Sequence, residues 1–515
     1  HALAAASIAA FLALGGALAT SIAGPGASSA VDSPVATSSQ AGLLPELRRA
    51  ASALEETLVI ASNRGPVTFA EQGGELVSSR AGGGLATGLA PLVEHNDRVQ
   101  WIASAVSGAD LRAAKSNAQV PEFNLGYVTM DPARYNLAYN KISNEILWYL
   151  SHGFWDGLTT PRFEGGWRKA WDAYRELNRR FSDAIGSAAP QGSAVLVQDY
   201  HLSLVGDMLK QDRPDLRTVH FTHTPFSGPE EFGRLPDLIQ EDLLKGMAGF
   251  GACGFHTGRW ARRFGQTCDE FLGHTPETFV APLGVDPASV RKVAHSQEAD
   301  RWAKEIRARA GDRQIIGRTD RIELSKNILT GFEAYDDLLQ HNPDLRNKVS
   351  FVASIFPSRT DVDDYVAYTE RVKAKAAEIN RRYGTADWEP IILYTEDNNY
   401  ARGMAVLRES DVVLVNPVRD GLNLVAKETA IVGERNPTLV LSREAGFYDE
   451  LKAAGSEDSV LGINPFDVEQ TTQALRDALT LSPEQRVART SRLRAAVEGR
   501  SPRDWLDDQL TAARH

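Results

Sequence analysis

The stretch DVVLVNPVRDGLNLVAKE, residues 411–428, places an apolar run directly before a polar turn and a second, helix-like segment. We expect DVVLV to form a buried strand, and Asp420, Gly421 and Asn423 to form the turn that leads into a helix. Glu428 lies just inside that helix. Such a turn points backbone N–H groups beyond the strand, where an anion such as phosphate accepts their hydrogen bonds. The stretch therefore predicts a strand, a turn and a helix with an anion site at the turn.

The same alternation of apolar runs and amphipathic stretches continues on both sides of this unit. The runs are TLVIAS, WIAS, AVLVQDY, TVHFTHT and TFVAPLG, followed by QIIGR, VSFVASI, PIILYT, DVVLVN, TLVLS and VLGIN. Strands this uniformly apolar are typical of parallel sheets that are buried on both faces. We expect an α/β protein with two Rossmann-like, doubly wound domains at 56–290 and 291–485, and C-terminal helices at 486–515 that pack back on the first domain.

Composition excludes several classes of protein. The chain has 515 residues, 43% hydrophobic and 24% charged, with a net charge of −11 and a pI near 5.6. Nucleic acid and anionic membranes select basic surfaces, so we expect neither a nucleic-acid partner nor stable membrane association. The two cysteines, Cys253 and Cys268, form no C-x-x-C motif and predict neither a disulfide framework nor a zinc site. Reduced thiols favour a cytoplasmic location.

Residues 1–50 differ from the rest because they are rich in Ala, Ser, Gly and Pro. One interpretation is a disordered, dispensable extension. The other is a targeting segment, since SSAVDS resembles a cleavage site, although a basic n-region is absent and the chain starts with His1. We expect the extension.

Cations follow several of the expected strands. Arg64, Arg321, Lys326 and Arg359 all lie in segments that we expect to be turns at strand ends. In an acidic protein this placement favours phosphate binding, with Arg321 and Lys326 spaced to hold one pyrophosphate between a loop and the next helix. Surface cations on solvated loops explain the spacing equally well.

Two other chemistries fit less well. The glycine cluster AGGGLATG at 81–88 is not G-x-G-x-x-G and lies well past the first strand, which argues against a dehydrogenase. His220 and His223 lie three apart in an expected strand, so their side chains point to opposite faces and cannot share a metal ion. We therefore predict no metal site and no cofactor.

Eight segments in this order carry a resemblance to a known family: SNRGPV, GGGLATGL, AYNKISNEILW, VQDYHL, HFTHTPF, RIELSK, PSRTDVDDY and RDGLNLVAKE. The chain resembles the trehalose-6-phosphate synthases from about Leu58 to about Phe466. The resemblance implies the GT-B fold, in which two Rossmann-like domains face each other across a central cleft. It also implies transfer of glucose, with retention, from UDP-glucose or GDP-glucose to glucose 6-phosphate, giving α,α-trehalose 6-phosphate and a nucleoside diphosphate.

The resemblance also implies the site residues. Glucose 6-phosphate would be held by Arg64, Tyr139, Trp148, Asp199 and Arg359, with Trp101 as a wall of the pocket. The nucleotide-glucose would be held by Gly83, Gly84, His223, Arg321, Lys326, Asp420, Gly421, Leu422, Asn423, Leu424, Val425 and Glu428. Leu424 and Val425 would offer amides to a phosphate, and Glu428 would bind the ribose. The residues nearest the reaction would be Asp199, His223, Arg321, Lys326 and Asp420.

The family's mechanism is front-face substitution, in which the leaving phosphate deprotonates the acceptor hydroxyl. A double displacement would need a carboxylate nucleophile, and the matched residues offer none in that role. Arg321 and Lys326 would stabilise the leaving group without a metal ion.

Three questions stay open at this stage. Many family members read R-L-D-Y-S-K where this chain has RIELSK, and both uridine and guanosine donors occur among them. A pseudo-glycosyltransferase of the validoxylamine phosphate synthase type shares the fold, and a catalytically silent sugar-phosphate sensor would keep the same binding residues. The sequence also leaves open whether the protein forms a homo-oligomer.

Overall fold

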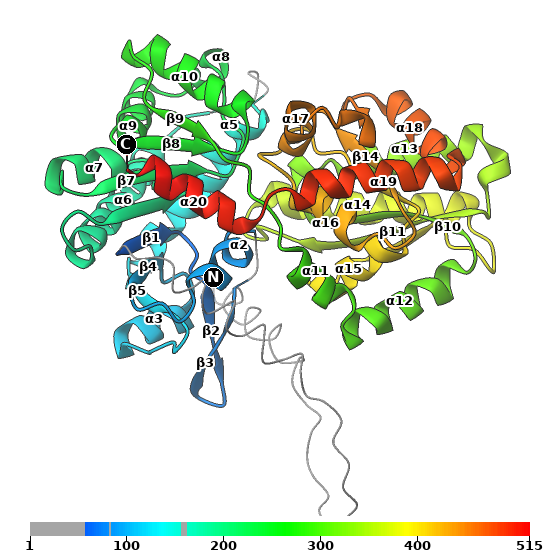
Figure 1. The fold of residues 1–515 in the computed structure, drawn as a ribbon, viewed down its shortest axis with the longest axis horizontal. Coiled ribbons are helices and arrows are strands. Elements are labelled where there is room, and N and C mark those ends of the chain that lie inside the picture. Colours follow the sequence, from blue (N-terminus) through cyan, green and yellow to red (C-terminus); the bar gives the residue numbers. More distant parts are fainter. Residues whose placement is uncertain (1–56, 82–83, 156–161, 515) are drawn as a thin grey trace, which may run out of the picture. The chain divides into compact units, whose positions relative to one another are not determined.

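The computed structural model describes residues 57–81, 84–155 and 162–514 (Figure 1). The expected extension at 1–50 lies outside the described residues. Within them the chain forms two parallel sheets, each with its own helices, and one antiparallel hairpin of β2 (Val67–Gln72) and β3 (Glu75–Arg80). This confirms the α/β prediction.

The first sheet has the order β5-β4-β1-β6-β7-β8-β9. Its strands are β1 (Leu58–Ser62), β4 (Val99–Ser104), β5 (Asn124–Val128), β6 (Ala194–Gln198), β7 (Arg217–Thr222), β8 (Ala252–Phe255) and β9 (Thr278–Val280). Every residue of β1 and β6 is buried, because helices cover both faces. β1 pairs with β6 in a register that sets Ser62 beside Gln198, so their carboxyl ends meet at one edge.

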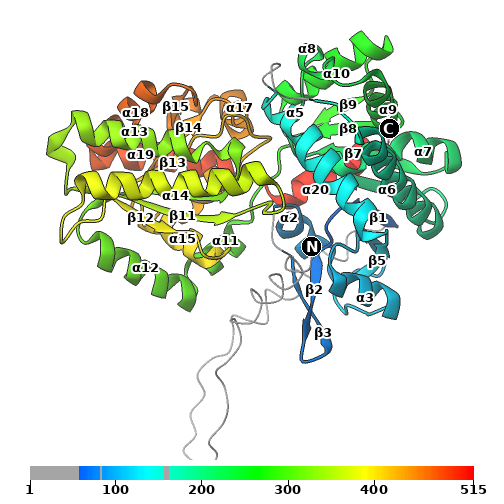
Figure 2. The same ribbon diagram turned by 180° about the vertical axis from the view of Figure 1, so that it is seen from behind.

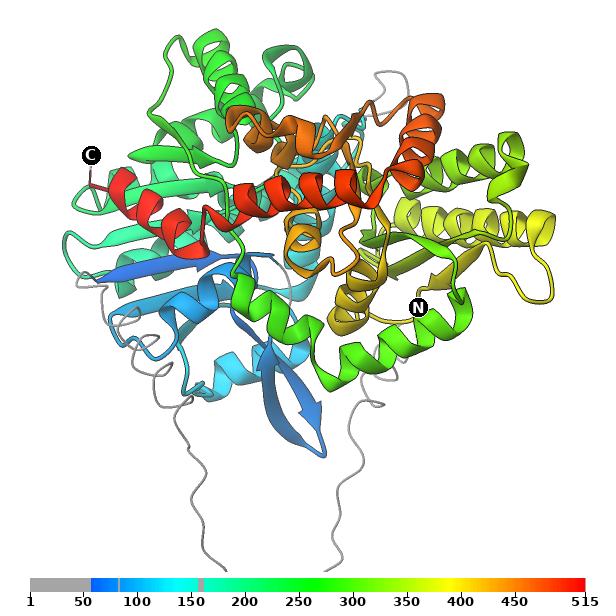
Figure 3. The ribbon, with the colours of Figure 1, turned by 45° about the vertical axis from the view of Figure 1, so that its right-hand side comes forward.

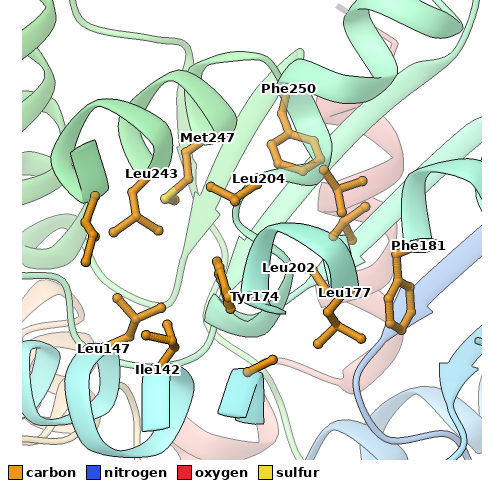
Figure 4. Close-up of a cluster of buried hydrophobic side chains, with 14 of the residues drawn as sticks. Ile142, Leu147, Tyr174, Leu177, Phe181, Leu202, Leu204, Leu243, Met247 and Phe250 are labelled. Atoms are coloured by element: carbon orange, nitrogen blue, oxygen red, sulfur yellow. The ribbon is translucent and has the colours of Figure 1, made fainter. Parts of the chain in front are cut away.

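The helices of this part are α2 (Gly84–Val93), α3 (Gly108–Ser116), α4 (Pro132–Asn136), α5 (Trp148–His152), α6 (Trp167–Ala188), α7 (Val205–Asp212), α8 (Pro229–Phe232), α9 (Asp237–Ala248) and α10 (Gly258–Leu272). A π-helix, η1 (Leu137–Leu147), joins α4 to α5. Figure 4 shows buried side chains of η1, α6 and α9 pointing toward one another, and this packing fixes η1 against the sheet.

The second sheet has the order β12-β11-β10-β13-β14-β15. Its strands are β10 (Gln314–Ile322), β11 (Val349–Pro357), β12 (Ile391–Tyr394), β13 (Val412–Val415), β14 (Thr438–Ser442) and β15 (Leu461–Ile463). Its helices are α11 (Pro287–Ala294), α12 (Gln297–Ala310), α13 (Ile328–His341), α14 (Asp363–Tyr383), α15 (Tyr400–Glu409), α16 (Leu424–Val432), α17 (Gly446–Ala453), α18 (Val468–Thr480) and α19 (Pro483–Glu498). Figure 1 shows α19 over one face of this sheet, and Figure 2 shows α14 over the other.

The expected strand QIIGR is longer than its apolar pattern indicated. β10 runs on to Ile322, so Arg321 lies on a strand and not in a loop, which corrects that expectation. The extension is stable because its buried polar side chains are paired: Arg318 contacts Asp320 at 3.0 Å and donates to Asn416 Oδ1 at 2.6 Å. His223 likewise lies one residue beyond β7, where we expected it within the strand.

The C-terminal helices divide between the two sheets. α19 contacts α16 and β14, whereas α20 (Pro502–Ala512) contacts β7 and α2. Figure 3 shows the two helices following each other in red. In the described part of the chain, every helix is too short or too polar to cross a bilayer.

Candidate active site

Asp199 and His223 lie beside each other where β6 and β7 end. Asp199 has a φ of +71°, a strained conformation for a residue other than glycine. The His223 N–H donates to Asp199 Oδ1 at 3.2 Å. Burial raises the pKa of Asp199 to about 6, although the N–H groups of Tyr200 and His223 oppose the shift. The structure thus brings these two predicted residues together.

A cavity of about 250 Å³ in the first part of the fold is lined among others by Arg64, Tyr135 and Tyr139. The Tyr139 ring is stacked between Tyr135 and His201, with centroids 5.6 Å away on each side. Arg64 donates to the Tyr139 hydroxyl at 3.4 Å. Burial raises the pKa of Tyr139, but Arg64 and Arg359 outweigh it and lower the value. The cavity wall therefore carries a positive field suited to a phosphate.

Arg359 enters the same region from the second sheet. It follows β11 with a φ of +49°, and its guanidinium lies 4.6 Å above the Trp148 ring. It donates to Glu323 Oε1 at 2.8 Å and to Asn144 Oδ1 at 3.2 Å. Trp148 is buried beneath it. Arg359 is therefore held by partners from both parts of the fold.

Glu323 joins the two predicted phosphate-binding arginines. Its carboxylate is 1% exposed and lies 3.2 Å from Arg321 and 2.8 Å from Arg359. Burial alone would raise its pKa, but Arg321 and Arg359 lower the pKa to about 2. Glu323 stands where many family members have Asp, and the structure gives it this bridging position.

Lys326 is the third predicted phosphate-binding cation of this region, after Arg321 and Arg359. It ends the short 3₁₀ helix η3 (Leu324–Lys326), ahead of α13, and contacts Asp420 Oδ2 at 2.6 Å. Burial would raise the pKa of Asp420, but Lys326 lowers it. Both carboxylates keep their charge beside the cations.

The turn at Asp420–Asn423 opens α16 as the sequence indicated. Asn423, at φ +86°, caps the helix by accepting from Ala426 N at 3.0 Å, and its amide donates to Asp420 Oδ2 at 3.1 Å. A Cβ at Gly421 would overlap the carbonyl oxygen of His223, so only glycine fits there. Leu422 N donates to Asp420 Oδ1 at 3.4 Å, while Leu424 and Val425 are the first residues of α16. The first N–H groups of a helix lack intrahelical partners and suit a phosphate.

Glu428 lies one turn further along α16. Its Oε1 accepts from the Tyr400 hydroxyl at 2.7 Å, and burial raises its pKa to about 7. Tyr400 also lines a cavity of about 630 Å³, together with Lys292, Asn398 and Asn399. A ribose at Glu428 would therefore have this cavity beside it.

The predicted roles of Trp101, Gly83 and Gly84 stay predictions. Trp101 is 1% exposed, in the middle of β4, and donates from Nε1 to Ser62 Oγ at 2.8 Å. We expected a pocket wall, and in the structure the Trp101 ring packs among the residues of the hydrophobic core. Gly83 lies outside the described residues, and Gly84 is the first residue of α2.

Comparison with known proteins identifies the family to which the chain belongs. The sequence model of glycosyltransferase family 20 matches residues 56–515. The chain belongs to glycosyltransferase family 20. An α,α-trehalose-phosphate synthase (UDP-forming) 2 from Aspergillus fumigatus is 32% identical over 463 residues, covering 85% of this chain and 93% of that protein.

Solved structures of similar proteins share the family 20 fold. The structure "Trehalose-6-phosphate from E. coli bound with UDP-2-fluoro glucose" is 26% identical with a TM-score of 0.75, over 89% of this chain and 99% of that one. An α,α-trehalose-phosphate synthase (UDP-forming) from Burkholderia xenovorans, in complex with glucose 6-phosphate, is 25% identical with a TM-score of 0.75, over 89% and 100% of the two chains. These structures confirm the GT-B prediction.

The family 20 site contains residues that sequence reasoning missed. Asn144 and Tyr365 hold Arg359, Tyr400 holds Glu428, and Gln198 contacts His223. Gln198 and Asn144 lie inside matched segments, but a motif does not show which of its polar residues faces the site.

Proposed function

We propose that this chain transfers glucose, with retention, from a nucleotide-glucose to glucose 6-phosphate, forming α,α-trehalose 6-phosphate and a nucleoside diphosphate. The observation that carries the proposal is the bridge at Glu323, which joins Arg321 to Arg359, beside Trp148 and Asn144. Lys326, three residues after Glu323, contacts Asp420 of the α16 turn. Two cation groups, one for each substrate's phosphate, are thereby held next to each other. The names of the relatives, which are UDP-forming synthases, support the same activity.

We assign the acceptor phosphate to Arg64, Tyr139 and Arg359. Their support is the positive field around Tyr139 and the cavity that Arg64 and Tyr139 line. We assign the donor diphosphate to Arg321, Lys326 and the first amides of α16, and the ribose to Glu428. Before substrate binds, the carboxylates of Glu323 and Asp420 hold Arg321 and Lys326 in position. A bound phosphate would then replace these carboxylate contacts and meet cations that are already correctly placed.

The acceptor's proton is best taken by the leaving phosphate. Asp420 is committed to Lys326 and to the amides of its own turn, and Asp199 accepts from the His223 N–H. Both His223 ring nitrogens have hydrogen-bond partners, and burial lowers its pKa to about 3. Asp420 and His223 are therefore poor bases for the reaction, whereas the departing diphosphate lies on the same face of the sugar as the acceptor.

Location also follows from the thiols. Cys253 and Cys268 are both free and buried. We propose a cytoplasmic location, where thiols stay reduced.

The test is an assay of nucleoside diphosphate release with UDP-glucose or GDP-glucose, with and without glucose 6-phosphate. We expect release that depends on glucose 6-phosphate with at least one donor, and an Asp420→Asn variant that is at least 100-fold slower, the order seen when a transition-state contact is removed. The mutant controls for contaminating enzymes. Release by neither donor would contradict the proposal.

A further inference from the structure

A chain of hydrogen bonds leads from His223 to the C-terminal helix α20. His223 Nε2 contacts Gln198 Oε1 at 3.0 Å, and Gln198 Nε2 donates to Gln509 Oε1 at 2.9 Å. Gln509 Nε2 in turn donates to the Trp505 carbonyl at 3.4 Å. Both glutamines are 0% exposed. No matched motif covers α20, so this link comes from the structure alone.

The same chain continues on the other side of the His223 ring. His223 Nδ1 contacts His256 Nε2 at 3.2 Å, and the Leu283 N–H donates to His256 Nδ1 at 3.3 Å. Burial lowers the pKa of His256 well below its ordinary value, although the nearby Ala281 carbonyl raises it. Both rings are therefore neutral and carry one N–H each.

These contacts give the chain one direction. The Leu283 N–H points at His256 Nδ1 as a donor, so we assign the His256 proton to Nε2, which faces His223 Nδ1. The His223 proton then lies on Nε2 and is donated to Gln198 Oε1. Gln198 can present that oxygen only while its amide nitrogen faces Gln509.

The ring that this chain holds lies between the two substrate sites. The backbone N–H of His223 donates to Asp199, and the His223 carbonyl oxygen lies against Gly421 in the proposed donor turn. Trp505 packs edge-on against the ring at 5.6 Å and against Phe221 at 5.2 Å. A movement of His223 would therefore displace groups on both the acceptor and the donor side.

We propose that Gln509 is a positioning residue for the transfer reaction, which acts through Gln198 to fix His223 in the Nε2–H tautomer. This inference rests on the proposed function for its catalytic consequence, but the tautomer itself is a property of the protein alone. Without the Gln509 oxygen, the Gln198 amide is free to turn over and offer its NH₂ to His223. The His223 proton then moves to Nδ1, and the ring loses its fixed contact with His256.

The test is to label the histidines with ¹⁵N and record the imidazole tautomers by NMR in the wild type and in Gln509→Met. Met has a similar volume and removes the acceptor oxygen. We expect Nε2–H for His223 and His256 in the wild type, and a mixture or the Nδ1–H form of His223 in the variant. We also expect kcat to fall about 3- to 10-fold, the loss from one buried hydrogen bond, with KM for glucose 6-phosphate within twofold. The His223 signals are assigned by their absence in His223→Asn.

Two controls separate positioning from general damage. Leu510→Met changes a buried neighbour on the same helix, and we expect it to keep the tautomer and the kcat. Gln509→Glu keeps an acceptor oxygen, and we expect it to retain the Nε2–H form. If Gln509→Met does not fold, Gln509→Leu removes the same acceptor oxygen and leaves Gln198 in place.

An unchanged His223 tautomer in Gln509→Met would overturn the inference, as would equal losses of kcat in Gln509→Met and Leu510→Met. A wild type that shows the expected tautomers but releases no nucleoside diphosphate would contradict the proposed function and leave the hydrogen-bond chain intact.

Discussion

At the scale of single residues, the cations proposed to bind phosphate are already held by carboxylates and aromatic rings. Arg359 lies over Trp148 and beside Glu323, and Lys326 contacts Asp420. A phosphate therefore meets side chains whose positions are fixed, which lowers the ordering cost of binding. The same arrangement allows each contact to be tested against the substrate group that it recognises.

Arg359 is expected to recognise the phosphate of the acceptor. A charge-assisted hydrogen bond contributes about 1.5 to 3 kcal/mol, so Arg359→Ala should lower kcat/KM for glucose 6-phosphate by about 10- to 150-fold. With unphosphorylated glucose as acceptor, the wild type lacks the contact already, and the mutation should cost little. Steady-state kinetics with both acceptors measure this coupling. Equal losses with the two acceptors would show that Arg359 supports the fold or the donor.

Glu428 is expected to make stability depend on pH. Burial raises its folded pKa from 4.5 to about 7. A raised pKa gives stability below pH 4.5 that is lost as the pH rises through 7, by up to about 3 kcal/mol. Glu428→Gln should therefore be more stable than the wild type at pH 8, and this advantage should shrink toward pH 5.

Urea denaturation at the two pH values measures the difference, and nucleotide-glucose affinity should fall in the same variant. Asp199, whose pKa burial also raises, is present in both proteins and cancels. A stability difference that does not change with pH would contradict this account of Glu428.

At the scale of elements, the start of α16 serves two purposes. Asn423 both caps the helix and ties its own amide to Asp420. The helix end is thus stabilised by the turn that the donor sugar would contact. Loss of the cap should affect stability and donor binding together.

Asn423→Ala should lower the free energy of unfolding by about 1 to 3 kcal/mol. The change removes the helix cap, and Ala tolerates a positive φ less well than Asn, whose polar side chain can form local hydrogen bonds. Donor affinity should weaken as well. Asp467→Ala is the matched control, since Asp467 caps a different helix, α18, by accepting from Gln470 N at 2.8 Å. The control should lose about 1 kcal/mol and keep its donor affinity. Titration calorimetry measures donor affinity, and thermal unfolding measures stability. Normal donor affinity in Asn423→Ala would rule out a role for Asn423 in donor binding.

The sequence predicted elements best where local pattern and burial agree. The apolar run at β13 and the turn before α16 were both evident, because strand burial and cap chemistry are local. The sequence did not indicate where β10 ends, because the strand contains the polar residues Arg318 and Asp320, which pair with each other in the core. The burial of Trp101 in the core was not evident either, because a motif does not state which face of a strand a side chain occupies.

Contacts that join distant segments could not be predicted at all. Gln198 and Gln509 are separated by 311 positions, and no local pattern relates them. The same is true of Asn144 and Arg359, which meet across 215 positions.

At the scale of the whole molecule, side chains of helix α10, which packs on the first sheet, contact segments that follow strands of the second sheet. Arg259, on α10, contacts Glu444 at 2.8 Å, the Arg443 carbonyl at 2.8 Å, and Asp449 of α17. Trp260 beside it donates from Nε1 to the Gly421 carbonyl at 3.1 Å. These contacts hold the Asp420–Asn423 turn against α10, and such contacts would help to exclude water from the donor that we propose to bind there.

Arg259→Met should loosen that closure. We expect the ratio of donor hydrolysis to transfer to rise about tenfold, the effect of about 1.4 kcal/mol. Arg492→Met is the control, because Arg492 pairs with Asp458 on the surface within the second part of the fold. The measurement is nucleoside diphosphate release with and without acceptor. An equal ratio in the two variants would show that the Arg259 contacts do not shield the donor.

The central claim is that one chain transfers glucose, with retention, from a nucleotide-glucose to glucose 6-phosphate, and the linkage formed is its most direct test. The enzyme is given nucleotide-glucose labelled with ¹³C at the anomeric carbon, together with unlabelled glucose 6-phosphate, and the product is examined by NMR. The account predicts a single ¹³C-labelled product with both anomeric carbons in the α configuration and joined 1,1, formed in step with nucleoside diphosphate. A β-linked product, or labelled free glucose in place of a disaccharide phosphate, would contradict it.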